Sequence, residues 1–378
     1  MCQNFMLSLG TWKLTSNMSS RTRFWYHVYA YTFFGIFIVT CIFTAVKLVV
    51  MICTGGQITQ VIEHMAKITL SVILIIKCRI YGGEEITKLI GTGMRDTNRA
   101  GKSSEKIRNI ILENVKFCNN VNLVVVVLTI MAGSFYDINV FVEAYQFEKQ
   151  HNFTIRPKHL MAVYYPFEEN FYTVFICENV LVIYITLLSC AYQTLLNSIM
   201  VNAVAQIKVI QYHFGSYDEH GKNQLTEIVL QKKLKSVIHH HQDLIKTIED
   251  LNDSINIAVL IEYYFSSVMI ASMIIQFMNG VHMAFYGVML VQVSFQLLLF
   301  GICADEIRTQ SEAIATNIYF TNWYERSIPT KKLILFSMMR SAKPLMLTIG
   351  PFGAMTAESV IAIFKGAYSY LSLLSQGK

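Results

Sequence analysis

Residues 343–378 read KPLMLTIGPFGAMTAESVIAIFKGAYSYLSLLSQGK. The stretch opens with Lys343-Pro344, and Gly350-Pro351-Phe352-Gly353 follows five residues later. Both segments interrupt a helix, because proline lacks the backbone N–H that a helix interior requires. Residues 356–376 contain no further proline. They predict a helix of about 20 residues, which is the length that crosses a bilayer.

The helix at 356–376 has two dissimilar faces. One is small or weakly polar until its end and consists of Ser359, Ala362, Gly366, Ser369, Leu373 and Gln376. The opposite face carries Val360, Ile361, Phe364, Tyr368 and Leu371. Small residues on a membrane helix favour close packing against another helix. The pattern is equally typical of a pore-lining helix, with a hydrophobic gate at Leu373, a polar ring at Gln376 and Ser369 on the same side.

The composition indicates an integral membrane protein. Of 378 residues, 53% are hydrophobic and 15% are charged, whereas a soluble domain carries about 25% charged residues. The net charge of +6 comes from Lys and Arg between apolar blocks, without a nucleic-acid-binding motif, so we expect no nucleic-acid partner. The eight cysteines are scattered and form no CxxC pair, so they predict neither a disulfide framework nor a zinc site.

Seven apolar blocks predict seven transmembrane helices, at about 29–51, 58–79, 121–142, 171–200, 255–278, 283–303 and 356–376. A polar loop at 143–170 follows the third block, and an amphipathic piece at 330–341 precedes the last. The predicted fold class is an all-α integral membrane bundle whose long helices extend into a cytoplasmic anchor domain. Its parts are the N-terminal region with four helices (1–203), an anchor segment (204–254), two helices (255–303), a second cytoplasmic segment (304–343) and the last helix (344–378).

Lys and Arg set the orientation. Most of the 31 lie in segments that share one side of the membrane if the N-terminus is cytoplasmic and the C-terminus extracellular. Asn152, in the sequon Asn152-Phe153-Thr154, is then extracellular and a candidate glycosylation site, whereas the sequons at Asn17 and Asn252 are cytoplasmic. G-protein-coupled receptors have the opposite orientation, and their Asp-Arg-Tyr and Asn-Pro-x-x-Tyr motifs are missing here.

A heptad seam leads into the fifth block. It consists of Leu230, Leu234, Val237, His241, Leu244, Ile248 and Leu251, spaced alternately by four and three residues. We expect one helix that projects from the membrane into the cytoplasm. The seam either packs on its own chain or joins subunits, with Leu234, Val237, His241, Leu244 and Ile248 as the assembly residues. His239, His240 and His241 point about 100° apart on a helix, so they predict no metal site.

Aromatic residues and methionines gather in the predicted outer halves of several spans. Together with a few polar residues they predict an apolar ligand pocket, lined by His64, Met65, Met131, Ser134, Phe135, Phe171, Phe175, Asn179, Met273, Phe277, Phe285 and Tyr286. Each residue singly is also typical of ordinary core. Glu178, inside the fourth span, is a candidate ion-pair partner of Lys67. No catalytic or cofactor motif is present, so we expect neither an enzyme nor a cofactor.

Short motifs near the end of the chain resemble those of the insect odorant receptors. They are Ile302-Cys303-Ala304-Asp305, Trp323-Tyr324, Met338-Met339-Arg340-Ser341-Ala342-Lys343-Pro344 and Ala367-Tyr368-Ser369-Tyr370-Leu371-Ser372-Leu373-Leu374, with Tyr165-Pro166-Phe167 before the fourth span. The resemblance implies an odorant-gated cation channel in the plasma membrane of sensory neurons. It also implies a tetramer with a central pore lined by the last span, a cytoplasmic anchor, and a pocket for a small volatile organic ligand. The family's gate then falls on Leu373, and its polar pore residue on Gln376.

Within that family the chain resembles an odorant-tuned subunit that works with co-receptor subunits. The co-receptor has a longer second cytoplasmic loop and a valine at the gate. Gustatory receptors are related, and they usually carry Thr-Tyr followed by Gln-Phe in the last span. Here Ser369 precedes Tyr370 and no Gln-Phe follows. A gustatory-receptor-like channel is therefore the second interpretation, and a non-conducting seven-span receptor is the third.

Overall fold

The computed structural model describes residues 19–55, 58–101, 104–150, 171–216, 224–278, 280 and 282–376. These residues are almost entirely helical. The α-helices are α2 (Ser20–Cys53), α3 (Ile58–Tyr81), α4 (Glu84–Ala100), α5 (Glu105–Gln150), α6 (Phe171–Gly215), α7 (Gln224–Met278), α8 (Met283–Tyr319), α9 (Ile328–Ser341) and α10 (Ala357–Gln376). Within the described ranges, the only bridge between extended residues joins Thr348 to Ala354, just before α10. The all-α fold that the sequence predicts is confirmed.

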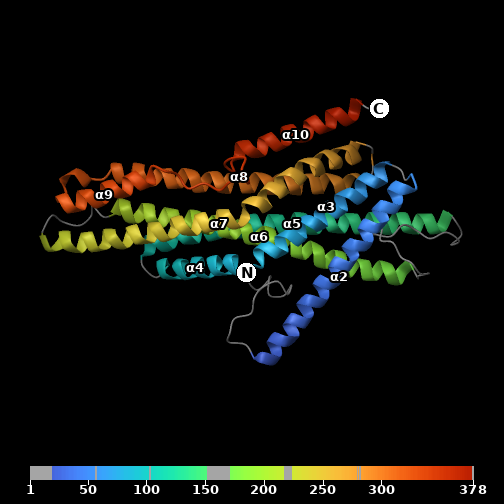
Figure 1. The fold of residues 1–378 in the computed structure, drawn as a ribbon, viewed down its shortest axis with the longest axis horizontal. Helices are drawn as coiled ribbons and strands as arrows, with labels where there is room; N and C mark the ends of the chain where they lie inside the picture. Colours follow the sequence, from blue (N-terminus) through green and yellow to red (C-terminus); the bar gives the residue numbers. More distant parts are fainter. Residues whose placement is uncertain are drawn as a thin grey trace.

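The helices form one elongated bundle. Figure 1 shows α5, α6, α7 and α8 running along its length, with α4 and α9 at one end and α2, α3 and α10 along the other half. The centre is α6, which packs most extensively against α5 and α8. Leu188, Met200 and Ile207 of α6 are fully buried. From Leu188 onward α6 is largely enclosed by its neighbours, so its apolar residues there continue around the helix rather than along one stripe, whereas Ile176, Val180 and Ile183 nearer its start are exposed.

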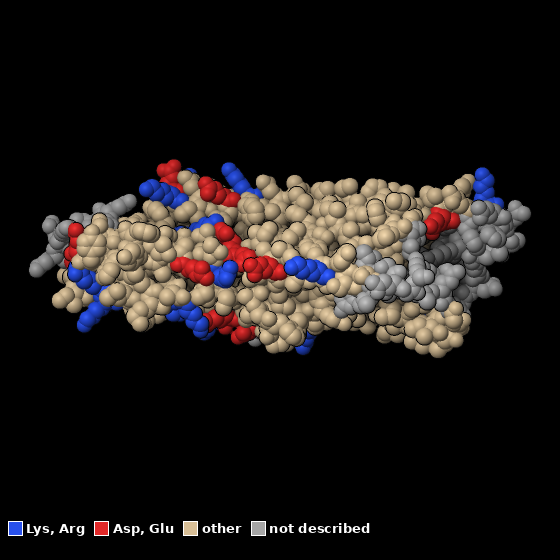
Figure 2. Space-filling model, turned by 90° about the horizontal axis from the view of Figure 1, so that it is seen from above, with Lys and Arg blue, Asp and Glu red and all other residues tan. Residues whose placement is uncertain are grey.

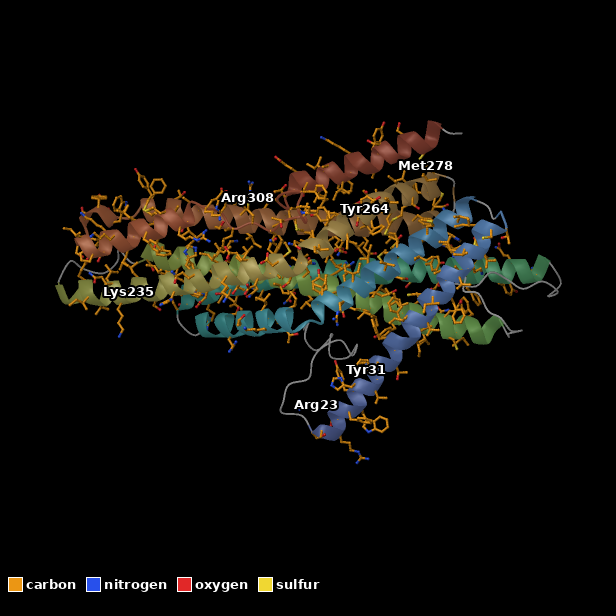
Figure 3. The ribbon with its side chains drawn as sticks, viewed as in Figure 1. Arg23, Tyr31, Lys235, Tyr264, Met278 and Arg308 are labelled. Atoms are coloured by element: carbon orange, nitrogen blue, oxygen red, sulfur yellow. The ribbon has the colours of Figure 1, made fainter. Side chains whose placement is uncertain are left out.

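Charge divides the bundle into two regions. On the face that Figure 2 shows, Lys, Arg, Asp and Glu gather at the end formed by α9 and the start of α7, and a broad uncharged band follows. Figure 3 traces α7 from Lys235 in the charged region, past Tyr264, to Met278 at the opposite end. The uncharged band is the region that suits a bilayer, because an unpaired charge is costly in hydrocarbon.

Five helices of the described chain are long and apolar enough to cross a membrane. They lie at Ser20–Cys53, Glu105–Glu143, Phe175–Gly215, Glu227–Met278 and Met283–Tyr319. The expected second and last spans correspond to α3 and α10, with 24 and 20 residues. Most of the helices are longer than the apolar blocks that predict them. In particular, α5 continues to Gln150, into the segment expected to be a loop.

The heptad seam lies inside the bundle. All seven of its residues are buried, and none is more than 7% exposed. The helix that carries the seam, α7, contacts α4, α6, α8 and α9 of the same chain. The structure therefore favours packing on its own chain for this seam. The expected single helix from the anchor into the membrane is present, because α7 runs without a break from Gln224 to Met278.

Several contacts fix the start of α10. The Ala357 backbone N–H donates to Oδ2 of Asp305 on α8, at 2.9 Å. Gly301, also on α8, lies so close that a Cβ there would stand 2.8 Å from Val360 and 2.9 Å from the Thr356 carbonyl oxygen. Gly350 has a positive φ of 51°, which favours glycine, and its N–H donates to the Asn256 carbonyl at 3.1 Å. The linker and α10 are thus anchored to α7 and α8.

Candidate ligand cavity

A cavity of about 300 Å³ lies between six helices in the uncharged half of the bundle. Its walls come from α2 (Phe37, Thr40, Cys41, Thr44), α3 (Leu70, Ser71, Leu74), α5 (Thr129, Ala132, Gly133, Tyr136), α6 (Val182, Ile185, Thr186, Ser189), α7 (Met269, Ser272, Met273, Gln276) and α8 (Phe285, Tyr286, Met289, Gln292). Its volume is at the lower end of the range of small-molecule sites, about 300–1,000 Å³. The cavity suits a compact organic molecule.

Aromatic rings and thioethers form one side of the cavity. The Tyr136 and Phe285 rings lie 4.8 Å apart between centroids, and Phe285 and Tyr286 lie 4.9 Å apart in an edge-to-face arrangement. Met269 and Met273 are buried on the facing helix α7. Thioether side chains are unbranched and adapt to irregular shapes, and they make favourable contacts with aromatic rings. This wall offers apolar area of irregular shape rather than one fixed hydrogen-bonding pattern.

Serine, threonine and glutamine side chains interrupt the apolar lining. Gln292 Nε2 donates to Thr129 Oγ1 at 2.8 Å, and Thr129 Oγ1 donates to the Val125 carbonyl at 2.7 Å, so this pair is held in place. Gln276 also lines the cavity, and it is 5% exposed. Its amide group carries two N–H donors and an acceptor oxygen, so it can bond a molecule that fills the cavity.

The structure brings three of the twelve predicted pocket residues to the cavity, namely Met273, Phe285 and Tyr286. The others that it describes lie outside the lining: His64, Met65, Met131, Ser134, Phe135, Phe175, Asn179 and Phe277. Phe175 packs on Phe141, with ring centroids 5.8 Å apart. Met65 and Met131 are 51% and 41% exposed on the outside of the bundle. The side chain of Phe171 is outside the described part of the structure.

Most of the lining was missed by the sequence reasoning, which sought aromatic residues. The missed residues include weakly polar ones four apart on one helix, such as Thr40 and Thr44, or Ser272 and Gln276. Residues four apart share a helix face. Weakly polar pairs inside otherwise apolar spans were therefore an available signal. The rotation of each helix, which decides what that face meets, could not be read from the sequence.

Beyond Ser359, which is half-buried, the described part of the predicted pore face of α10 is not covered by its own chain. Ala362 and Ser369 are exposed, and a Cβ placed on Gly366 would have nothing within 4 Å. Val360 and Ala367 instead form the buried side of the helix, at 0% and 1% exposure. Leu373 and Gln376 belong to α10, but their side chains are not described.

The remaining predicted sites lie elsewhere. The candidate glycosylation site Asn152 is outside the described residues. Glu178 is buried at 2% exposure. The side chain of Lys67, its predicted ion-pair partner, is not described, so the pair stays a prediction. Asn252 accepts hydrogen bonds from the Thr348 N–H at 2.7 Å and the Thr348 hydroxyl at 3.0 Å. His241 is buried in the anchor region, and this burial, together with the nearby Arg340, lowers its pKa to about 4.

Comparison with known proteins identifies the family. A family profile described as "7tm Odorant receptor" matches residues 57–368. Odorant receptor 10 of Aedes albopictus is 25% identical over 175 residues, which are 45% of this chain and 46% of that protein. Odorant receptor Or2 of Anopheles gambiae is 24% identical over 179 residues, 46% of this chain and 47% of that protein. The matched region thus spans about half the length of these curated relatives.

Solved structures show the same fold. The insect olfactory receptor OR5 from Machilis hrabei superposes with a TM-score of 0.83 at 13% identity, over 100% of this chain and 97% of that chain. The structure of the same receptor in complex with eugenol gives 0.82 at 12% identity, with the same coverage. The family profile covers most of the chain, and the bundle carries several helices of membrane-spanning length. The chain belongs to the odorant receptor family and is a multi-pass membrane protein.

Proposed function

We propose that this chain is the odorant-tuned subunit of an odorant-gated, non-selective cation channel. The observation that carries the proposal is the 300 Å³ cavity among six helices, walled largely by rings, thioethers and aliphatic groups, with hydroxyl and amide side chains between them. Such a cavity suits small, largely apolar volatiles with one or two hydrogen-bonding atoms, such as esters, alcohols or aromatic volatiles. The binding free energy would come mainly from burial, at about 25 cal/mol per Å² of apolar surface.

The pore is proposed to be lined by α10. Its small-residue face meets no other part of the chain at Gly366, and Ser369 is exposed on that side. A face of this kind, left uncovered by its own chain, suits a water-filled path shared with neighbouring subunits. Leu373 would form the hydrophobic gate and Gln376 the polar ring beside it.

Assembly is proposed to be a tetramer with co-receptor subunits, joined through the charged half of the bundle. Buried seam residues such as Leu234 and Ile248 would act indirectly, because they hold the anchor helices together. The exposed apolar residues Leu335, Phe336 and Met339 of α9 are better placed to touch a neighbour, at 42%, 56% and 77% exposure. Exposed apolar patches of this kind mark interaction sites.

The proposed topology has seven spans, a cytoplasmic N-terminus and an extracellular C-terminus, in the plasma membrane of sensory neurons. The charged half of the bundle, which includes Lys235 and Arg308, would then lie in the cytoplasm (Figure 3). Asn152 would be extracellular. Glycosidase treatment of the expressed protein should remove a glycan that Asn152→Gln also removes. A glycan on Asn17 or Asn252 would contradict this topology.

The functional test is expression in oocytes with and without the family co-receptor, followed by application of a volatile panel while current is recorded. We expect odorant-evoked cation current when both subunits are present, and Gln376→Lys should alter cation permeation without changing surface expression. Silence across a broad panel, with both subunits at the surface, would contradict the proposal. Ligand-induced thermal stabilisation without current would instead indicate a receptor that binds without conducting.

A further inference from the structure

A second, smaller chamber of about 70 Å³ adjoins the ligand cavity. Its lining includes Lys77 of α3, Gln193 of α6, Glu262 of α7 and Gln296 of α8. Glu262 and Gln296 are 7% and 4% exposed, so the chamber lies inside the bundle.

The polar groups of the chamber are deeply buried and incompletely bonded. Lys77 Nζ lies 2.7 Å from Glu262 Oε1, and both side chains are less than 10% exposed, at 7% and 9%. An ammonium group carries three donors, and this single contact uses one of them. Gln193 Oε1 and Gln296 Nε2 are buried, and neither has a hydrogen-bond partner within the described part of the chain. Gln296 as a whole is 4% exposed.

These two amide atoms specify the chemistry of an occupant. Gln193 Oε1 requires a donor, whereas Gln296 Nε2 requires an acceptor. A hydroxyl group supplies both, but a carbonyl or ether oxygen only accepts and a methyl group does neither. A buried polar group without a partner is costly, so the chamber favours an occupant that bonds both amides. Its volume has room for about two water molecules, at about 30 Å³ each, or for the end of an alkyl chain with its hydroxyl.

The two spaces share part of their lining. Leu70, Leu74, Ser189 and Met269 line both the chamber and the ligand cavity. Met269 has three rotatable side-chain bonds and no branch, so it changes rotamer at small cost. Movement of Met269 would connect the apolar cavity with the polar chamber.

We propose that the chamber bordered by Lys77, Gln193, Glu262 and Gln296 is a polar subsite that takes the terminal hydroxyl of an elongated odorant. The inference rests on the proposed function, because it extends the same ligand site. Water occupies the chamber when the ligand is short. A chain long enough to pass Met269 displaces this water and bonds Gln193 and Gln296 through its hydroxyl.

The test uses pairs of ligands that differ only at one end. Linear alkyl acetates of increasing length are compared with analogues in which the terminal methyl is replaced by a hydroxyl. For short chains the hydroxyl ends in the apolar cavity and should weaken activation. Beyond a threshold length it reaches the chamber, and the potency of the hydroxyl compound relative to its methyl partner should rise by about three- to tenfold. A ratio that stays flat with length in the wild-type channel overturns the proposal.

Gln296→Leu tests the subsite itself. It removes the donor at nearly constant volume, so the rise in the potency ratio should disappear. Gln206→Leu is the matched control, because Gln206 is also a buried glutamine, at 3% exposure, but bonds Thr97 outside both spaces. The rise should persist in that variant. Persistence of the rise in Gln296→Leu contradicts the proposal, and Gln193→Met provides the same test if Gln296→Leu does not reach the surface.

A binding measurement separates the channel proposal from the polar-subsite proposal. Thermal unfolding of the purified receptor complex is recorded with each ligand pair, which needs no channel opening. If no volatile evokes current but the hydroxyl compounds stabilise the protein beyond the threshold length, the channel proposal fails and the subsite stands. If current is evoked but neither potency nor stabilisation depends on chain length in this way, the subsite fails alone.

Discussion

At the scale of single residues, two aromatic side chains that look equivalent in the sequence occupy different surroundings. Tyr286 lines the cavity, whereas Phe175 packs on Phe141 outside the lining. We expect Tyr286→Ala to raise the odorant concentration needed for half-activation by about tenfold or more, because truncating a ring in a ligand contact loses buried area. Phe175→Ala should leave that concentration nearly unchanged. Dose–response curves at matched surface expression check this pair, and equal shifts in both variants would contradict the cavity assignment.

His241 predicts a pH dependence of stability. Its pKa is lowered to about 4 by burial, and Arg340 and His240 add to this effect. The centroids of the His241 and Phe214 rings are 6.4 Å apart. The unfolded chain, with an ordinary histidine pKa near 6.5, therefore binds the proton more strongly than the folded chain. Stability should fall as the pH drops below about 6.5 and level off below about 4.

Between pH 7.5 and 5.5 this single group should remove about 1.4 kcal/mol from the free energy of unfolding, the value of one pKa unit. Thermal unfolding of the purified complex at the two pH values measures the loss. His213, whose pKa is also lowered by burial, adds in the same direction. His241→Gln cannot be protonated in this range, so its loss should be smaller than that of the wild type. An identical loss in both would show that His241 carries no part of the effect.

At the scale of elements, α10 depends on α8 for its start. Asp305 Oδ2 accepts the Ala357 N–H, which is one of the donors that a helix leaves unbonded in its first turn. Asp305→Ala should cost about 1 kcal/mol of local stability, as the loss of a helix cap does. Hydrogen exchange at the first turn of α10 should accelerate accordingly, while Asp305→Asn retains an acceptor and should accelerate it less. Unchanged exchange in Asp305→Ala would mean that the cap is dispensable.

At the scale of the whole molecule, we expect substitutions in the buried seam and on the exposed surface of α9 to have different effects. Leu234→Asp with Leu244→Asp places charges where the side chains are 2% and 6% exposed, so the chain itself should misfold, at a cost of several kcal/mol. Phe336→Asp with Met339→Asp changes exposed positions, so the chain should fold but fail to form tetramers. Sizing chromatography and thermal unfolding of each variant distinguish these outcomes. Normal tetramers in the α9 variant would exclude that surface from assembly.

The sequence by itself determined the class of the molecule. Long apolar blocks with few charges predict membrane helices, and their composition alone carries that information, because a bilayer accepts a helix by its length and hydropathy. The unbroken run from the heptad seam into the fifth block likewise predicted that α7 is one helix. The end of α5 was misjudged, because the helix continues past its apolar block to Gln150.

Only the tertiary structure decided which side chains face one another. The cavity draws residues from six helices, and the rotation of each helix depends on contacts with its neighbours, which hydropathy does not record. The sequence therefore predicted Met273, Phe285 and Tyr286 as pocket residues from their side-chain type, but it did not predict Gln276. The Lys77–Glu262 pair shows the same limit, since 185 positions separate the two residues in the chain. The two charges meet only because α3 and α7 pack side by side. Each charge is tolerated inside the protein because the other one is its partner, since an unpaired buried charge is costly.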